Sequence, residues 1–213
     1  MANLELEERF LKELFRMGHE QRTLKIESGL LWTWWRGDPL PQLQPLSNFT
    51  VVTPTDLTLI AHLLDTPIEY VKQRIQDKHR PHVAYMHNTP VAVGWSARDQ
   101  AEFAEGLVHF RIPPKNRYFY FFVTLPEWRN RGIYTHLLQT ILHIESSENE
   151  RFWILHEIEN PASARGIAKA GFHLTSKFCL LSDDTPCFVP VSNDIERAQV
   201  GAAVFGLPLI KLT

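Results

Sequence analysis

Apolar residues in the middle of this chain change from a strand pattern to a helix pattern over some twenty positions. The run from Tyr118 to Val123 is aromatic and β-branched throughout, which predicts a strand buried on both faces. Pro126 ends that strand because proline has no N–H to give to a ladder. Apolar side chains then return at helical spacing, at Leu137, Leu138, Ile141 and Leu142.

The turn between this strand and this helix is basic and contains one glycine, Arg129-Asn130-Arg131-Gly132-Ile133-Tyr134. The order strand, glycine turn, helix directs unpaired backbone N–H groups and the positive end of a helix dipole at one spot. Such a spot binds phosphate, and the arginines add charge that a phosphate can use. A plain connection between strand and helix is the alternative interpretation.

A second strand and helix follow the first pair. Residues Phe152–Ile158 read as a strand, after which Asn160 is a good N-cap and Pro161 suits a first helical turn. Gly171 is a good stop for the same helix. The pattern therefore predicts a short helix between Pro161 and Gly171.

The rest of the chain predicts a mixture of strands and helices. Helices are expected over 57–64, 68–76 and 195–200, and strands over 49–53, 82–87, 90–97, 106–112, 173–181 and 187–191. The strand at 106–112 reverses the direction in which the next strand enters the sheet, and its pairing stays open.

Both ends of the chain differ from its middle. Residues 4–17 form an amphipathic helix pattern whose apolar face docks on the main domain or on a partner. Trp32, Trp34 and Trp35 are interpreted as core or as cover for a sheet edge, with an aromatic wall for a substrate or a dimer contact as the alternative. We place an N-terminal extension at 1–46, the main domain at 47–182 and a C-terminal extension at 183–213.

Composition narrows the class of protein. The chain has 213 residues, 44% hydrophobic and 22% charged, which suits a globular domain with a real core. A net charge of −2 gives no case for nucleic-acid binding. Two cysteines are too few for a disulfide framework, and neither a membrane-length apolar run nor a signal-like start is visible, so a cytoplasmic location is expected. The 10 histidines lack metal-site spacing, so no metal is expected.

Together the two strand–helix segments resemble the GNAT N-acetyltransferase superfamily, most strongly from Tyr118 to Phe172. The residues that fall on the fixed positions of its two motifs are Arg129, Gly132 and Tyr134 in the first, and Asn160, Ser163, Gly171 and Phe172 in the second. Two residues depart from the family pattern. Tyr134 replaces a small residue, and Ile167 stands where many members carry a tyrosine that protonates the departing thiolate.

The resemblance implies an α/β fold and an activity. The fold is a mixed, mostly antiparallel sheet of about six to eight strands with a splayed parallel pair, flanked by helices, here with an N-terminal helical extension. The activity is direct transfer of an acetyl group from acetyl-CoA to a primary amine of a small molecule, amino acid or peptide. No nucleic acid or membrane partner is expected, and the chain is expected to be a monomer or homodimer. A non-catalytic acyl-CoA-binding sensor or scaffold is the alternative.

The resemblance also assigns site residues. Those expected to bind acetyl-CoA are Val123, Thr124, Leu125, Arg129, Asn130, Arg131, Gly132, Ile133, Tyr134, Thr135, Asn160 and Ser163. Glu157 is the candidate base that deprotonates the ammonium, and Tyr120 the group that returns a proton to sulfur. The alternative is that Glu157 is a solvated strand end and water carries the protons. Residues 55–80 are expected to select the acceptor.

Overall fold

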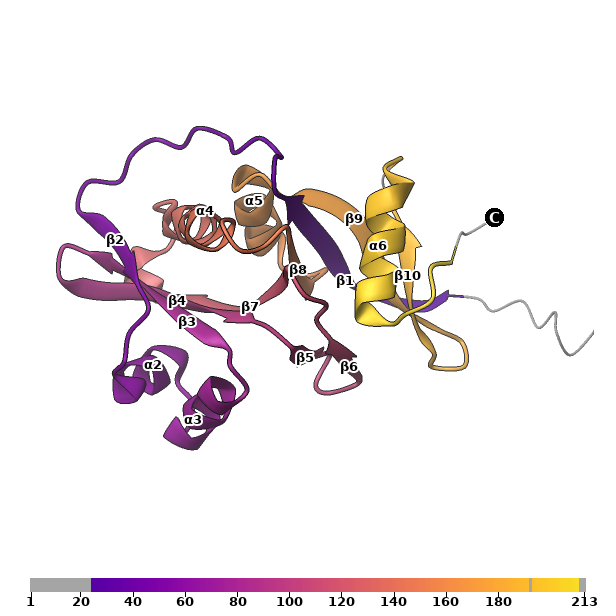
Figure 1. The fold of residues 1–213 in the computed structure, drawn as a ribbon, viewed down its shortest axis with the longest axis horizontal. Coiled ribbons are helices and arrows are strands. Elements are labelled where there is room, and N and C mark those ends of the chain that lie inside the picture. The colour runs from indigo at the N-terminus through magenta and orange to yellow at the C-terminus, as the bar shows by residue number, and fades with distance from the viewer. Residues whose placement is uncertain (1–23, 192, 211–213) are drawn as a thin grey trace, which may run out of the picture.

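The computed structural model describes residues 24–191 and 193–210, and the amphipathic pattern at 4–17 lies outside them. An eight-stranded sheet forms its centre, with strand order β10-β9-β1-β8-β7-β4-β3-β2 (Figure 1). The strands of this sheet are β1 (Leu24–Trp35), β2 (Phe49–Val52), β3 (Arg80–Met86), β4 (Thr89–Ala97), β7 (Asn116–Thr124), β8 (Arg151–Glu157), β9 (His173–Leu181) and β10 (Pro186–Pro190). The expected mixed sheet with one parallel pair, β7 and β8, is confirmed.

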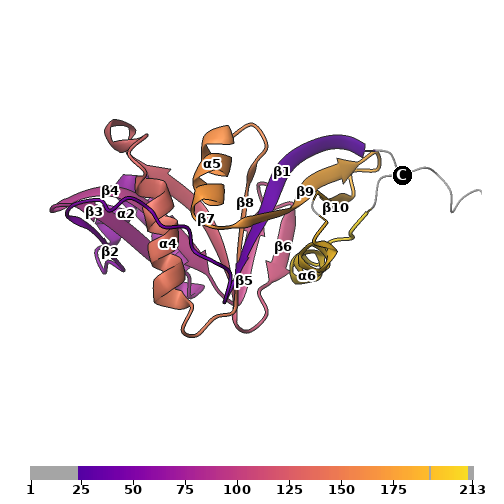
Figure 2. The same cartoon turned by 90° about the horizontal axis from the view of Figure 1, so that it is seen from above.

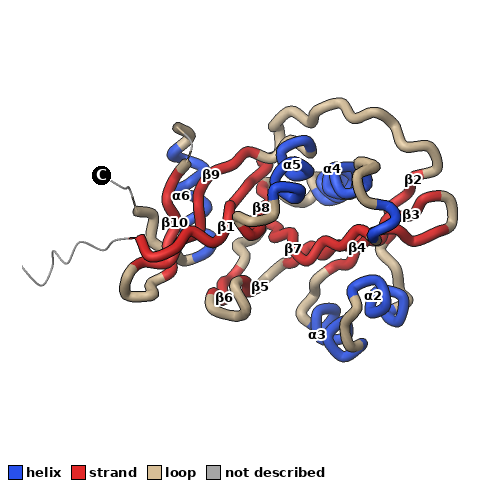
Figure 3. Tube along the Cα trace, turned by 180° about the vertical axis from the view of Figure 1, so that it is seen from behind, coloured by secondary structure: helices blue, strands red, loops and turns tan. Residues whose placement is uncertain are grey.

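Helices cover both faces of the sheet. They are α2 (Leu57–Leu64), α3 (Ile68–Gln76), α4 (Ile133–Glu145), α5 (Pro161–Lys169) and α6 (Ile195–Phe205), with a short 3₁₀ turn η1 (Pro126–Trp128). Figures 1 and 3 show α4 and α5 on one face and α2 and α3 on the other. None of the helices in the described ranges is long and apolar enough to cross a membrane.

The tryptophan-rich segment is an inner strand of this sheet. β1 pairs antiparallel with β8 on one side and with β9 on the other. Trp32 and Trp34 are buried beneath α4 and α5, while Leu31 faces the opposite core. A strand that is apolar on both faces suits an inner position. The sheet therefore includes a strand from the segment that we expected to be an extension.

The connector after β1 crosses the outer side of α4 on its way to β2 (Figure 2). Gln139 of α4 donates to the Pro41 carbonyl, and the His136 ring lies 2.9 Å from the Gln44 carbonyl oxygen. At its start, Asp38 accepts two hydrogen bonds from Arg197 of α6, at 2.7 and 2.8 Å. These contacts hold the connector against α4 and against α6.

The extra strand near 106–112 belongs to a separate hairpin. β5 (Gln100–Phe103) pairs antiparallel with β6 (Val108–Arg111), outside the large sheet. The hairpin is anchored by its aromatic side chains, since Phe103 and Phe110 both pack on Phe205 of α6. Because the hairpin contributes two strands that leave the main sheet, β7 returns antiparallel to β4, as their direct pairing requires.

A buried carboxylate ties α4 to three strands. Glu145 is 3% exposed and accepts hydrogen bonds from Ser96 Oγ at 2.9 Å and Arg117 Nε at 3.0 Å. The His82 ring nitrogen lies 3.0 Å from the same carboxylate. Burial by itself would raise the pKa of Glu145, but these partners outweigh it and hold that pKa below its ordinary value. The cluster fixes the C-terminal end of α4 over the sheet.

Candidate active site between the splayed strands

The parallel strands β7 and β8 separate halfway along their length. Their pairing runs from Asn116 opposite Arg151 to Phe119 opposite Ile154 and ends there. Beyond that point, β8 stays paired with β1, and β7 stays paired with β4. Neighbouring strands that each follow a different partner leave a wedge-shaped opening between them.

A bulge in β7 lies where the strands part. Trp95 of β4 pairs with Tyr120, but Val93 pairs with Val123, so β7 carries one extra residue there. Phe121 adopts a positive φ of 52°. The Phe122 ring lies over Gly94, where an added Cβ would come within 2.2 Å of it. The bulge was not predicted, because the sequence here continues the strand pattern without interruption.

A groove of about 1150 Å³ passes through the opening. One half is lined by the loop after β7, by the start of α4 and by α5, and the other by α3, the tip of the β5–β6 hairpin and the tyrosines of β7. Of the predicted site residues, eleven line the groove, namely Tyr120, Thr124, Arg129, Asn130, Gly132, Ile133, Tyr134, Thr135, Glu157, Asn160 and Ser163.

The three other predicted cofactor residues, Val123, Leu125 and Arg131, do not line this groove. The Val123 and Leu125 side chains pack around Trp95 on the α2 side of the sheet. The Leu125 N–H donates to the Val91 carbonyl at 2.9 Å. Arg131 stacks its guanidinium 4.9 Å from the centre of the Trp128 ring. Phe122 lines the groove in their place, because the bulge turns it toward α4.

The start of α4 has the form of an anion site. Gly132 is its N-cap, with φ 78°, and no side chain of the described residues caps it. Three other helices, α2, α5 and α6, are capped by the side chains of Asp56, Asn160 and Asp194. The first N–H groups of α4 therefore remain available to a ligand in the groove, and the dipole favours an anion there.

Arg129 fixes the loop that precedes this helix. Its Nε donates to the Thr124 carbonyl at 3.0 Å, which joins the end of β7 to the turn. Its other guanidinium N–H groups remain at the groove, which Arg129 lines. A pyrophosphate at the start of α4 fits this combination of backbone amides and one arginine.

Tyr134 lies between α4 and α5. Its hydroxyl is 3.2 Å from Ser163 Oγ, and its ring packs against Gly166, where an added Cβ would come within 2.5 Å of the ring. The ring also lies 5.5 Å from that of Phe122. Burial raises the pKa of Tyr134 well above its ordinary value. The side chain thus points at α5, while its backbone stays in the first turn of α4.

We predict that Tyr134→Ala keeps CoA affinity within about tenfold of the natural protein, or about 1.4 kcal/mol. The expected contact with the cofactor is made by the backbone amide, which alanine retains. Isothermal titration calorimetry with CoA measures the effect, and Tyr134→Phe, which removes only the hydroxyl, is the matched control. Binding by Tyr134→Ala but not by the natural protein would show instead that the ring blocks the groove.

Two other positions singled out by the family comparison, Asn160 and Ile167, have structural roles. Asn160 accepts a hydrogen bond from the Ser163 N–H at 3.0 Å and so caps α5, as its position predicts. Ile167 is fully buried in the core beneath α4 and α5. A residue buried there has no access to a thiolate in the groove.

The other half of the groove holds the predicted proton carriers. Tyr120 lines it, and its hydroxyl lies 2.5 Å from Nδ1 of His79. Burial raises the pKa of Tyr120 well above its ordinary value, and the charge of Arg74 offsets only part of that. Glu157 is exposed at the end of β8, on the groove wall. His79 carries no motif signal, so sequence reasoning missed it.

Among the described residues, no group of three or more His, Cys, Asp or Glu side chains could hold a metal ion.

The sequence matches the model of the acetyltransferase (GNAT) family over residues 51–172. The chain therefore belongs to that family. No curated protein matches the sequence.

Solved structures show the same fold. An acetyltransferase of the GNAT family from Colwellia psychrerythraea matches with a TM-score of 0.52 and 13% identity, over 73% of this chain and 56% of that protein. Aminoglycoside acetyltransferase AAC(6')-Ib, in complex with coenzyme A and kanamycin, matches with a TM-score of 0.51 and 15% identity, over 66% of this chain and 92% of that one. A second structure of AAC(6')-Ib, containing acetyl-CoA, matches with a TM-score of 0.52.

Proposed function

We propose that this protein transfers an acetyl group from acetyl-CoA to a primary amine. The observation that carries the proposal is the uncapped start of α4, which opens on a groove between splayed parallel strands. We propose that the amides of Gly132 to Thr135 hold the pyrophosphate and that the pantetheine arm enters between β7 and β8. Membership of the GNAT family and the coenzyme A bound to AAC(6')-Ib support this donor.

We propose that the acceptor binds in the half of the groove lined by α3, the tip of the β5–β6 hairpin and the tyrosines of β7. This acceptor half favours a cation. Glu105 and Glu157 line it, while Glu102 and Arg74, which also line it, pair with each other at 2.9 Å and offset each other's charge. The aromatic side chains of Tyr70 and Phe121 lie in edge-to-face contact on the same wall. An ammonium group with an apolar portion suits such a lining. AAC(6')-Ib, an aminoglycoside acetyltransferase, is in complex with kanamycin, which is consistent with an amine acceptor here.

The proton steps are assigned to Glu157 and Tyr120. An ammonium must lose a proton before it attacks, because its reference pKa is about 10. Glu157 takes that proton directly or through water, and its exposed position lets the proton leave to solvent. Tyr120, whose hydroxyl stays protonated, returns a proton to the departing sulfur. Holding both reactants in line supplies much of the rate, so modest proton carriers suffice.

A panel assay tests the proposal. Acetyl-CoA is mixed with the protein and one amine at a time, namely kanamycin, spermidine or L-lysine, and free thiol is measured. We expect amine-dependent thiol release with at least one of them. Acetyl-CoA binding without thiol release for every amine would favour the sensor or scaffold alternative, which the departures at Tyr134 and Ile167 keep open.

We predict that Glu157→Gln lowers kcat by about 10²-fold with little change in the KM for acetyl-CoA. Glutamine keeps the size and the hydrogen-bonding oxygen of the side chain but cannot accept a proton. Steady-state kinetics from pH 6 to 9 on the amine found above measure the effect, and Glu159→Gln, an exposed neighbour, is the control. If kcat of Glu157→Gln equals that of the natural protein across this pH range, Glu157 is not the base.

A further inference from the structure

A buried histidine lies behind Tyr120. His79 follows α3 and is 4% exposed, with Nδ1 2.5 Å from Tyr120 Oη and Nε2 2.9 Å from the Gln100 carbonyl oxygen. A carbonyl oxygen only accepts, so Nε2 carries the hydrogen and donates it. Nδ1 is then a free acceptor for the hydroxyl of Tyr120. The surroundings of His79 thus fix both its tautomer and the direction of the tyrosine hydrogen bond.

The pair connects two cavities. Tyr120 lines the groove, whereas His79 lines a second cavity of about 640 Å³ between α3 and the β5–β6 hairpin. Figure 3 shows these two elements on the same side of the sheet. The cavities share Tyr70, Arg74 and Glu102 in their walls. A proton on Tyr120 can therefore move away from the reactants without leaving the protein.

Electrostatics keep the pair in one protonation state. Burial is the largest influence on His79 and lowers its pKa. The Gln100 carbonyl and the carboxylates of Asp77 and Glu102 act in the opposite direction, while the charge of Arg74 lowers the pKa further, and the net shift is downward. At pH 7 the pair consists of a neutral imidazole and a protonated tyrosine, which together can take up one proton.

The chemistry of amide formation requires a place for one proton. An ammonium that becomes an amide loses two N–H protons, and the departing sulfur gains one. Glu157, under the proposed function, releases the first proton to solvent. The second is still on nitrogen when the nitrogen–carbon bond has formed and must reach sulfur when the carbon–sulfur bond breaks.

We propose that His79, acting through Tyr120, stores this second proton. The proton passes from nitrogen to Tyr120 Oη while the hydroxyl proton of Tyr120 moves to Nδ1 of His79. As the carbon–sulfur bond breaks, Nδ1 returns its proton to Oη and Oη gives one to sulfur. The products are the amide, free CoA thiol and one proton in solvent. The inference rests on the proposed acetyl transfer, and His79 itself touches neither reactant.

The substitution His79→Asn tests whether His79 holds this proton. The variant is assayed with acetyl-CoA and the amine that gives thiol release. Asparagine offers Tyr120 an acceptor oxygen but no basic nitrogen. We expect kcat at pH 7 to fall by about 10²-fold with the KM for acetyl-CoA unchanged. The defect should shrink above pH ~8.5, because a thiolate leaves there without a proton. A structural role would lower kcat by the same factor at every pH.

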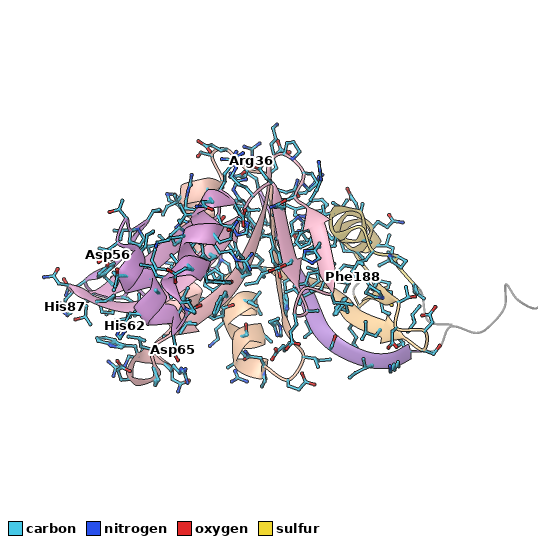
Figure 4. The ribbon with its side chains drawn as sticks, turned by 90° about the horizontal axis from the view of Figure 1, so that it is seen from below. Arg36, Asp56, His62, Asp65, His87 and Phe188 are labelled. Atoms are coloured by element: carbon cyan, nitrogen blue, oxygen red, sulfur yellow. The ribbon has the colours of Figure 1, made fainter. Side chains whose placement is uncertain are left out.

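The control is His87→Asn, since His87 is exposed at the tip of the β3–β4 hairpin, at the outer end of the molecule (Figure 4). Its kcat should match that of the natural protein. Nitrogen-15 NMR of the labelled imidazoles should show His79 as the neutral Nε2–H tautomer.

Three results would overturn the inference, namely an Nδ1–H tautomer, a natural kcat in His79→Asn, or a defect independent of pH. If thiol release is observed, an unchanged kcat in His79→Asn or a pH-independent defect would refute the role of His79 and leave the proposed acetyl transfer unaffected. Absence of thiol release with every amine would instead overturn the acetyl transfer and the store with it.

Discussion

Gly132→Glu is expected to weaken CoA binding by at least about 10²-fold, or about 2.7 kcal/mol, while the protein stays folded. Gly132 precedes the free amides of α4 and lines the groove, so a glutamate places a negative charge at the proposed pyrophosphate position. An added Cβ would come no closer than 3.6 Å to the His136 ring, so the fold has room for a side chain. Calorimetry with CoA and a thermal melt measure the two effects.

The positive φ of Gly132 calls for a matched control, because a side chain in that conformation costs about 1–2 kcal/mol wherever it occurs. Gly206→Glu supplies it. Gly206 has φ 66°, nothing lies within 4 Å of its added Cβ, and it ends α6 outside the groove. The control should lose similar stability and no CoA affinity. Equal CoA affinity in Gly132→Glu and the natural protein would remove this turn from the site.

Glu145→Ala is expected to cost about 3–5 kcal/mol of unfolding free energy. The substitution leaves the charge of Arg117 buried without its carboxylate and takes away the partner of His82 and Ser96. Urea unfolding at pH 7 measures the loss. Glu148→Ala, at an exposed residue in the turn that follows α4, should change the free energy by less than about 0.5 kcal/mol. If Glu145→Ala loses no more unfolding free energy than Glu148→Ala, the hydrogen-bonded cluster around Glu145 adds no stability.

The pH dependence of this loss has a definite sign. Because the folded protein lowers the pKa of Glu145, the carboxylate contributes its stability above the ordinary glutamate pKa of about 4.3. That contribution disappears as pH falls through the lower pKa of the folded state. The difference between the natural protein and Glu145→Ala should therefore be full at pH 7 and shrink below pH ~4.

Local patterns predicted the elements well. The run of aromatic residues before Pro126 and the helical spacing after Gly132 are properties of neighbouring residues, and both elements form where they were expected. The helices at 57–64 and 68–76 also match. The last helix continues beyond the expected end at 200, through Gly201, which packs closely on Leu31 and Trp153, and ends at Phe205 before Gly206 with φ 66°.

Long-range pairing could not be predicted in the same way. Nothing local to the tryptophan segment indicates that β1 inserts between β8 and β9, since both partners lie more than a hundred residues away. Likewise, His79 and Tyr120 are separated by 41 positions and meet only because α3 packs beside β7. The turn at the start of α4, our proposed phosphate site, was predictable because all of its parts are consecutive in the sequence.

Backbone amide NMR during a titration with CoA tests whether the cofactor binds at the start of α4, because it both detects binding and locates it. We expect the amides of residues 132–135 to shift first and most strongly, together with those of the β7 bulge, while those of α6 stay unchanged. Saturating CoA that shifts no amide, or that shifts amides remote from the start of α4, would contradict the proposed cofactor site.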